Sequence, residues 1–130
     1  MADAVIVSTA RTAIGTAFKG SLIDVDGMEL GTKVVAEAVA RAGIDPALVD
    51  DIVLGEALYG GGDIARYAAT ECGMEGVPGL AHNRHCASGL AAVATAAGSV
   101  RCDLDRVVVA GGVQASSAAP RATRGVPGTD

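Results

Sequence analysis

Four side chains suited to catalysis or metal binding fall within five consecutive residues of this 130-residue chain. They are both of its histidines, His82 and His85, its only asparagine, Asn83, and Cys86. The thiolate is the reactive form of cysteine, and the N-terminus of a helix favours it. A short apolar strand pattern precedes this cluster and a helix pattern begins at Cys86. We therefore predict that Cys86 is a nucleophile at a strand-to-helix junction.

Two small residues, Ser88 and Gly89, follow shortly after Cys86. Small side chains at the start of a helix allow its backbone to pack closely against another backbone. The unpaired N–H groups of the first helical turn are also able to hold the negative charge that develops on an oxygen atom during nucleophilic attack. The segment thus combines a nucleophile with groups suited to an oxyanion.

Less specific interpretations of these residues stay open at this point. Free cysteine usually fills space in the interior, and we interpret Cys72 and Cys102 in this way. A zinc site made of His82, His85 and Cys86 would lack a fourth ligand, so we expect no metal site. Adjacent side chains diverge in most backbones, and the base for a nucleophile normally comes from elsewhere in the fold. We expect both histidines to be structural or to line the pocket.

Composition argues against several classes of protein. Half of the residues are hydrophobic and 19% are charged, which excludes intrinsic disorder. A net charge of −5 and an aromatic content of 2% argue against nucleic-acid binding. The uncharged, Ala-rich stretch at residues 87–100 is 14 residues long, whereas a membrane span needs about 20 apolar residues. With no visible targeting peptide, we expect one cytoplasmic domain with reduced thiols and no membrane contact.

Apolar patterning predicts alternating strands and helices. Short apolar runs predict buried strands at residues 4–8, 52–54, 79–84 and 107–110, the last ended by Gly111-Gly112. Helical spacing predicts three helices: one opened by an Asp26–Glu29 capping box and running to about Arg41, then 63–72 and a buried one over 86–100. The glycines at 60–62 and the tail at 120–130 are expected to be loops. This alternation predicts an α/β sheet covered by helices on both faces.

The segment Asn83-Arg84-His85-Cys86-Ala87-Ser88-Gly89-Leu90 closely resembles the nucleophile segment of thiolases, the enzymes that cleave or make 3-oxoacyl-CoA thioesters. Thr9-Ala10-Arg11-Thr12 with Ile14-Gly15 resembles the opening strand and loop of that family. Ala65-Arg66 with Ala68-Ala69 resembles the helix before the nucleophile, and Val108-Val109-Ala110-Gly111-Gly112 resembles the strand after the nucleophile helix. These matches keep the family's order and spacing over residues 4 to about 120.

The resemblance implies a thiolase-like layered fold of which this chain holds the N-terminal half, a mixed sheet with helices on both faces. It implies that residues 1–119 form the N-terminal core without its last strand, and that residues 120–130 begin an inserted loop domain. It also implies that Cys86 is the catalytic nucleophile and carries an S-acyl intermediate. Coenzyme A and acyl-CoA are then substrates, and no bound cofactor or metal is expected. A dimer or dimer of dimers is implied, with the strand at 79–84 paired antiparallel to its twofold mate.

Four positions depart from the pattern that is common in thiolases. Gln114 and Ser116 replace an acidic residue and a methionine, Tyr67 replaces a frequent glutamine, and His85 stands where an apolar residue or lysine is common. These changes indicate a divergent subgroup and leave the nucleophile in place.

The resemblance also implies a histidine in a Gly-His-Pro motif and a second cysteine in a Cys-x-Gly-Gly motif, and neither motif occurs in the 130 residues. We therefore expect a truncated chain or one piece of a split enzyme, inactive by itself. Such a chain is expected to associate with the polypeptide that carries the second half.

Two other functions fit part of the pattern. A ketoacyl-synthase-like condensing enzyme also has its nucleophile at a helix start, although the Asn-x-x-Cys-x-Ser-Gly spacing favours a thiolase. Acyl transfer from a carrier protein, without reaction of coenzyme A, would identify it. A non-catalytic binding or assembly module of the same fold is the second alternative. Gly-His-Pro and Cys-x-Gly-Gly codons downstream in the reading frame would favour the enzyme.

Overall fold

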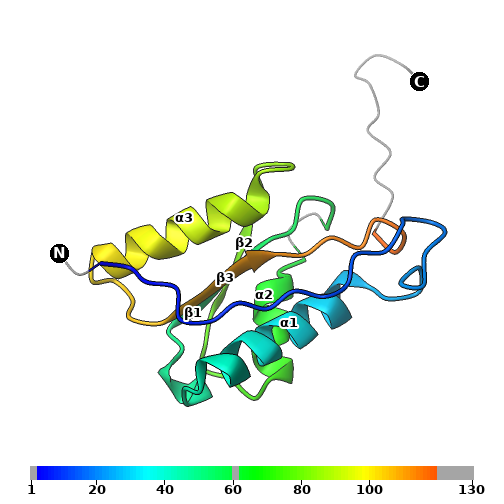
Figure 1. Ribbon diagram of the computed structural model, residues 1–130. Coiled ribbons are helices and arrows are strands. Elements are labelled where there is room, and N and C mark those ends of the chain that lie inside the picture. Colours follow the sequence, from blue (N-terminus) through cyan, green and yellow to red (C-terminus); the bar gives the residue numbers. More distant parts are fainter. Residues whose placement is uncertain (1–2, 60–61, 120–130) are drawn as a thin grey trace.

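The computed structural model describes residues 3–59 and 62–119 and shows helices packed around a small sheet (Figure 1). Along the chain the elements are α1 (Gly27–Ala42), the short 3-10 helix η1 (Pro46–Leu48), β1 (Asp51–Gly55), α2 (Ile64–Glu71), β2 (Gly79–His82), α3 (Ser88–Arg101) and β3 (Val108–Gly112). Our expectations for Gly60 and Gly61, and for a loop domain that begins at residues 120–130, lie outside the described residues.

The three strands form a parallel sheet in the order β2-β1-β3. In Figure 1, α3 covers one face of the sheet, and α1 and α2 cover the other. The central strand is buried from both sides, since Ile52, Val53 and Leu54 expose 0%, 2% and 3% of their surface. A continuous apolar run is what a doubly covered parallel strand requires. The predicted α/β class with helices on both faces is confirmed.

The first helix has the ends that its sequence predicts. The Asp26 carboxylate accepts a hydrogen bond of 2.8 Å from the Glu29 N–H, and Gly43 closes the helix in the left-handed conformation at φ 65°. Its buried face repeats every four residues and includes Gly31. A Cβ atom at Gly31 would lie 2.6 Å from Cγ2 of Ile64, so this glycine sets the close packing of α1 on α2.

The last helix is less buried than its composition predicts. Its inner face is buried, since no more than 8% of the surface of Ala91, Ala92 or Ala96 is exposed. Its other face is open, with Leu90 75% exposed and Val93 37% exposed. The prediction of a fully buried helix is therefore wrong for one face of α3. None of the helices in the described part of the chain has the length and apolarity needed to cross a bilayer.

Three predicted boundaries shift near the cysteine cluster. The second strand of the sheet ends at His82 rather than Arg84, and α3 begins at Ser88 rather than Cys86. The intervening residues form a turn instead. The double glycine does not end β3, because Gly111 and Gly112 continue the ladder opposite Leu54 and Gly55.

The predicted buried strand at residues 4–8 is wrong. Residues 3–10 form no strand, and the side chains of Val5, Ile6 and Val7 are 75%, 79% and 71% exposed. A strand needs a neighbour to pair its backbone groups. No strand among the described residues pairs with this segment.

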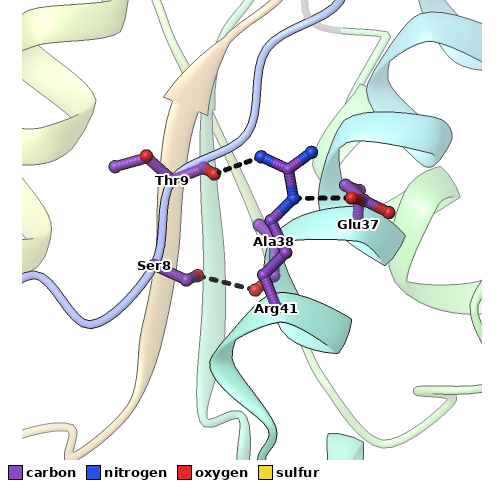
Figure 2. Close-up of polar contacts among 5 residues, drawn as sticks. All are labelled: Ser8, Thr9, Glu37, Ala38 and Arg41. Carbon is purple, nitrogen blue, oxygen red and sulfur yellow. Dashed lines mark hydrogen bonds and ion pairs between the residues drawn. The ribbon is translucent and has the colours of Figure 1, made fainter.

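Two contacts to α1 hold the N-terminal segment instead (Figure 2). The Ser8 hydroxyl donates to the Ala38 carbonyl over 2.6 Å. The Arg41 guanidinium donates to the Thr9 carbonyl over 3.0 Å and to the Glu37 carboxylate over 2.5 Å. The Thr9 carbonyl and the Ser8 hydroxyl thus hold the segment on α1. The side chains of Val5, Ile6 and Val7 stay in contact with solvent.

Candidate active site

The carboxyl ends of the three strands meet at Gly55, which is paired with His82 of β2 and with Gly112 of β3. Ligands of open parallel sheets bind beyond this edge. The segments that leave the strands here, residues 56–59, 83–87 and 113–117, surround an open cavity of about 510 Å³. Cys86 lies in its wall with an exposed side chain. The fold therefore brings the predicted nucleophile to the edge of the sheet where small-molecule sites form.

A tight turn presents Cys86 to this cavity. The Asn83 side chain accepts a hydrogen bond of 3.0 Å from the His85 N–H and donates to the Ala57 carbonyl over 3.4 Å. His85 is held at φ 51°, in the left-handed region that favours glycine. Cys86 follows directly and leads into α3. The asparagine of the cluster is thus a turn-forming residue that also ties the turn to the loop after β1.

The start of α3 leaves backbone donors unpaired. Ala87 is the N-cap residue and supplies no side-chain acceptor. Among the described residues, neither the Gly89 N–H nor the Leu90 N–H has a hydrogen-bond acceptor. Donors of this kind favour negative charge close to a helix N-terminus. Close packing of Gly89 is confirmed, because a Cβ atom at Gly112 would lie only 3.1 Å from the Gly89 Cα.

The two histidines have different surroundings in the structure. His85 lines the cavity beside Cys86. His82 is the last residue of β2, and its Nε2 atom lies 3.2 Å from the Thr95 hydroxyl of α3. His82 therefore joins β2 to α3. No group of three or more histidine, cysteine or acidic side chains in the described ranges is arranged to hold a metal ion.

The other two cysteines lie away from the cavity of Cys86. Cys72 is half-buried, and its thiol donates to the Thr32 carbonyl over 3.7 Å. Burial, and to a lesser extent the charge of Glu71, raises the pKa of the Cys72 thiol. Cys72 lines a separate open cavity of about 630 Å³ that contains no residue of the 82–86 cluster. Cys102 is exposed at the end of α3, so the expectation that it fills space is wrong.

Glu56 is a buried carboxylate next to the site that was not predicted from the sequence. Glu56 is 2% exposed, and its carboxylate accepts hydrogen bonds from the Asp63 N–H over 3.0 Å and the Ile64 N–H over 2.7 Å. It fixes the start of α2 to the carboxyl end of β1. The available signal was an acidic residue placed directly after a buried apolar strand.

Tyr59 was also missed, and it joins two walls of the cavity. Its hydroxyl accepts a hydrogen bond of 3.1 Å from the Ala115 N–H and lies 3.3 Å from the Ala115 carbonyl. Burial raises the pKa of Tyr59. The two residues are 56 positions apart, so no local pattern reveals the contact.

The model of the family described as thiolase, N-terminal domain, matches residues 4–128. This chain belongs to the thiolase family. It is 42% identical over 128 residues to an acetyl-CoA acetyltransferase of Cupriavidus necator, and 41% identical over 123 residues to one of Escherichia coli. The alignments cover 96% and 92% of this chain, but only 32% and 31% of those relatives. The chain therefore spans about one third of the length of the curated thiolases it matches.

A solved thiolase structure shows the same fold. The crystal structure of the Bacillus anthracis acetyl-CoA acetyltransferase superimposes with a TM-score of 0.87 at 38% sequence identity. The match covers 94% of this chain and 32% of that one. The partial thiolase-like fold predicted from the sequence is confirmed.

The departures from the common thiolase pattern gather at the cavity. His85, Gln114 and Ser116 all line it together with Cys86. The fourth departure, Tyr67, lies on α2 with 44% of its surface exposed. Three of these four departures therefore lie beside the cysteine.

Proposed function

We propose that Cys86 is the acyl-accepting nucleophile of a thiolase-type acyltransferase. The observation that carries the proposal is its position: an exposed thiol in the cavity at the carboxyl edge of the sheet, just before the unpaired N–H groups of α3. The names of the relatives support acyl-CoA thioesters as substrates. Neither of the other two thiols combines exposure with a place in this cavity.

In the degradative direction, the Cys86 thiolate attacks the 3-keto carbon of a 3-oxoacyl-CoA. The carbonyl oxygen takes up the negative charge, and donors at a helix start are suited to hold it. The bond between C2 and C3 then breaks, and its electron pair leaves with C2, which is protonated to give acetyl-CoA. The acyl group remains on the Cys86 sulfur as a thioester. A second coenzyme A removes it as acyl-CoA, and the reverse sequence is a condensation.

The remaining catalytic groups are proposed to come from the part of the protein that this chain does not contain. Thiolysis needs a base for the cysteine and an acid or base at C2. The resemblance assigns these roles to a histidine and a second cysteine beyond residue 130, together with most coenzyme A contacts. The 130-residue chain is then inactive by itself, and it functions as a homo-oligomer or together with the second half.

Reconstitution tests this proposal. The chain would be combined with a polypeptide that carries the remaining two thirds of a thiolase, and thiolysis of acetoacetyl-CoA would be followed. We expect Cys86→Ser to abolish turnover and Cys102→Ser, a change at the other exposed thiol, to leave it intact. Equal turnover in both variants would contradict the proposal. Acyl transfer only from a carrier protein would identify a ketoacyl synthase instead, and binding without transfer would identify an assembly module.

A further inference from the structure

Ser88 is a buried hydroxyl residue next to the Cys86 turn. It is the first residue of α3 and only 4% exposed. Its hydroxyl accepts a hydrogen bond of 2.8 Å from the Arg84 N–H and donates one of 2.6 Å to the His85 carbonyl. A hydroxyl has one proton to donate, and here that proton is used within the turn. Ser88 therefore joins the start of α3 to both residues that precede Cys86.

The turn needs this support because its backbone is strained. His85 occupies φ 51° without being a glycine, an unfavourable conformation that persists only where the surroundings enforce it. The Asn83 side chain accepts a hydrogen bond from the His85 N–H. The hydroxyl and the N–H of Ser88 both donate to the His85 carbonyl. Cys86 lies between His85 and Ser88, the two residues that the bonds to the His85 carbonyl join.

The sheet fixes Ser88 in turn. A Cβ atom at Gly55, at the end of β1, would lie 2.6 Å from the Ser88 carbonyl carbon and 2.7 Å from its Cβ. The absence of a side chain at Gly55 thus lets Ser88 rest directly on the strand. The position of Cys86 is linked to the central strand through this contact and the two hydrogen bonds of the Ser88 hydroxyl.

We infer that Ser88 is a positioning residue for the Cys86 thiol. The inference rests on the proposed role of Cys86 as a nucleophile and adds the element that holds it in place. Loss of the Ser88 hydroxyl leaves the Arg84 N–H without its acceptor and removes one of the two hydrogen bonds that the His85 carbonyl accepts from Ser88. The turn then relaxes, and the thiol leaves its place before α3. The hydroxyl itself is not assigned any contact with the substrate.

Site-resolved alkylation tests this inference on the 130-residue chain, combined with the second-half polypeptide of the reconstitution if the chain needs that partner to fold. Iodoacetamide labelling at neutral pH would be followed by peptide mass spectrometry for all three cysteines. The rate at Cys86 relative to Cys102 is the readout, since Cys102 is an exposed thiol at the far end of the same helix. Cys72 reports on folding, because its half-buried thiol labels fast only if the core opens. Ser99→Ala, which removes a hydroxyl bonded to Asp105 near the other end of α3, is the matched control.

We expect Ser88→Ala to lower the Cys86-to-Cys102 ratio by at least about fivefold, because two hydrogen bonds are lost and a single one accounts for about that factor, with Cys72 still slow. Ser88→Thr keeps the hydroxyl and should restore the ratio, and Ser99→Ala should not change it. An unchanged ratio in Ser88→Ala would overturn the positioning role and leave the nucleophile proposal standing. A ratio near one in the unsubstituted chain would show that α3 gives Cys86 no advantage over Cys102 and would also overturn the positioning role. The nucleophile proposal is decided separately by the Cys86→Ser variant in the reconstitution.

If the Ser88→Ala variant unfolds, amide hydrogen exchange in the unsubstituted chain tests the positioning role of Ser88 instead. The inference requires that the Arg84 amide exchange slowly, although the residue is exposed, because Ser88 is its acceptor. Exchange at the rate of a free peptide would overturn the positioning role.

Discussion

Cys86 and Cys102 lie at opposite ends of one helix. Cys86 precedes the first residue of α3 by two positions, and Cys102 is its C-cap residue. Both thiols are exposed, so access to solvent does not distinguish them. The helix dipole does, because it favours negative charge at the N-terminus and disfavours it at the C-terminus.

We predict that Cys86 is alkylated about tenfold faster than Cys102 at neutral pH, since each helix end contributes up to about 1 kcal/mol and 1.4 kcal/mol is a factor of ten. Cys72 should be slower still, because burial raises its pKa and keeps the thiol protonated. Brief iodoacetamide treatment and peptide mapping measure all three rates. Equal labelling of the two exposed cysteines would show that α3 does not activate Cys86.

A second prediction concerns the glycines under the site. An alanine Cβ at Gly55 would lie 2.6 Å from the Ser88 backbone, whereas one at Gly89 would have its nearest neighbour at 3.7 Å. Gly55→Ala should therefore destabilise the chain by about 1–3 kcal/mol. Gly89→Ala should be neutral, while Gly89→Val, which carries two further methyl groups towards Gly112, should cost more than about 2 kcal/mol. Urea midpoints test the order, and a Gly55→Ala variant as stable as the parent would show that the contact is not tight.

Local signals account for what the sequence predicted correctly. Asp26 and Gly43 mark the ends of α1 by their own chemistry, and the apolar run at 52–54 is long enough to identify the central strand. The Cys86 junction was recognised from its neighbours along the chain. Its boundary was off by two residues because the Asn83 and Ser88 side chains close a local turn, with His85 in the left-handed region, and this turn occupies the residues before the helix.

Long-range contacts account for what the sequence did not predict. The apolar run at residues 4–8 has the composition of a strand, but strand formation depends on a partner that no described strand provides. Tyr59 and Ala115 meet only after β1 and β3 have paired. Glu56 is buried because it caps α2 across a loop. Acidic residues are mostly exposed in proteins, so residue type alone predicts a surface position for Glu56.

A third prediction concerns alkaline pH and Tyr59. Burial raises the pKa of Tyr59 above its usual value of 10.0. The folded state therefore holds the phenolic proton more tightly, and this contribution to stability is present below pH about 10 and is lost as the pH rises through the folded pKa. Tyr59→Phe should lower stability by about 1 kcal/mol at neutral pH through the lost hydrogen bond to Ala115. Its free energy of unfolding should then fall less steeply at alkaline pH than that of the parent.

Urea unfolding at neutral pH and at pH about 10–11, above the usual tyrosine pKa, measures both effects. Tyr67→Phe is the matched control, since Tyr67 is 44% exposed and has no hydrogen bond from its hydroxyl among the described residues. The same alkaline slope in both variants would rule out a contribution from Tyr59.

A fourth prediction is that this chain is not a stable monomer in isolation. Leu90 on α3 and the run Val5-Ile6-Val7 expose between 71% and 79% of their surfaces, and exposed apolar patches of this kind mark interaction surfaces or cause aggregation. We expect a dimer, aggregates, or stability only beside the second half of the protein. Leu90→Ser should reduce the association. Light scattering at several concentrations is the test, and a monodisperse monomer that melts cooperatively would contradict the expectation.

Acyl transfer to Cys86 from an activated thioester tests the central claim most directly. S-phenyl thioacetate has a good leaving group and needs neither a protein base nor coenzyme A contacts, so the reaction depends on the thiols of the chain alone. After a brief reaction and acid quenching, peptide mapping shows which sulfur carries the acetyl group. The account predicts a hydroxylamine-sensitive acetyl thioester mainly on Cys86, with little on Cys102 and Cys72. An acetyl group shared equally by the two exposed cysteines would contradict it.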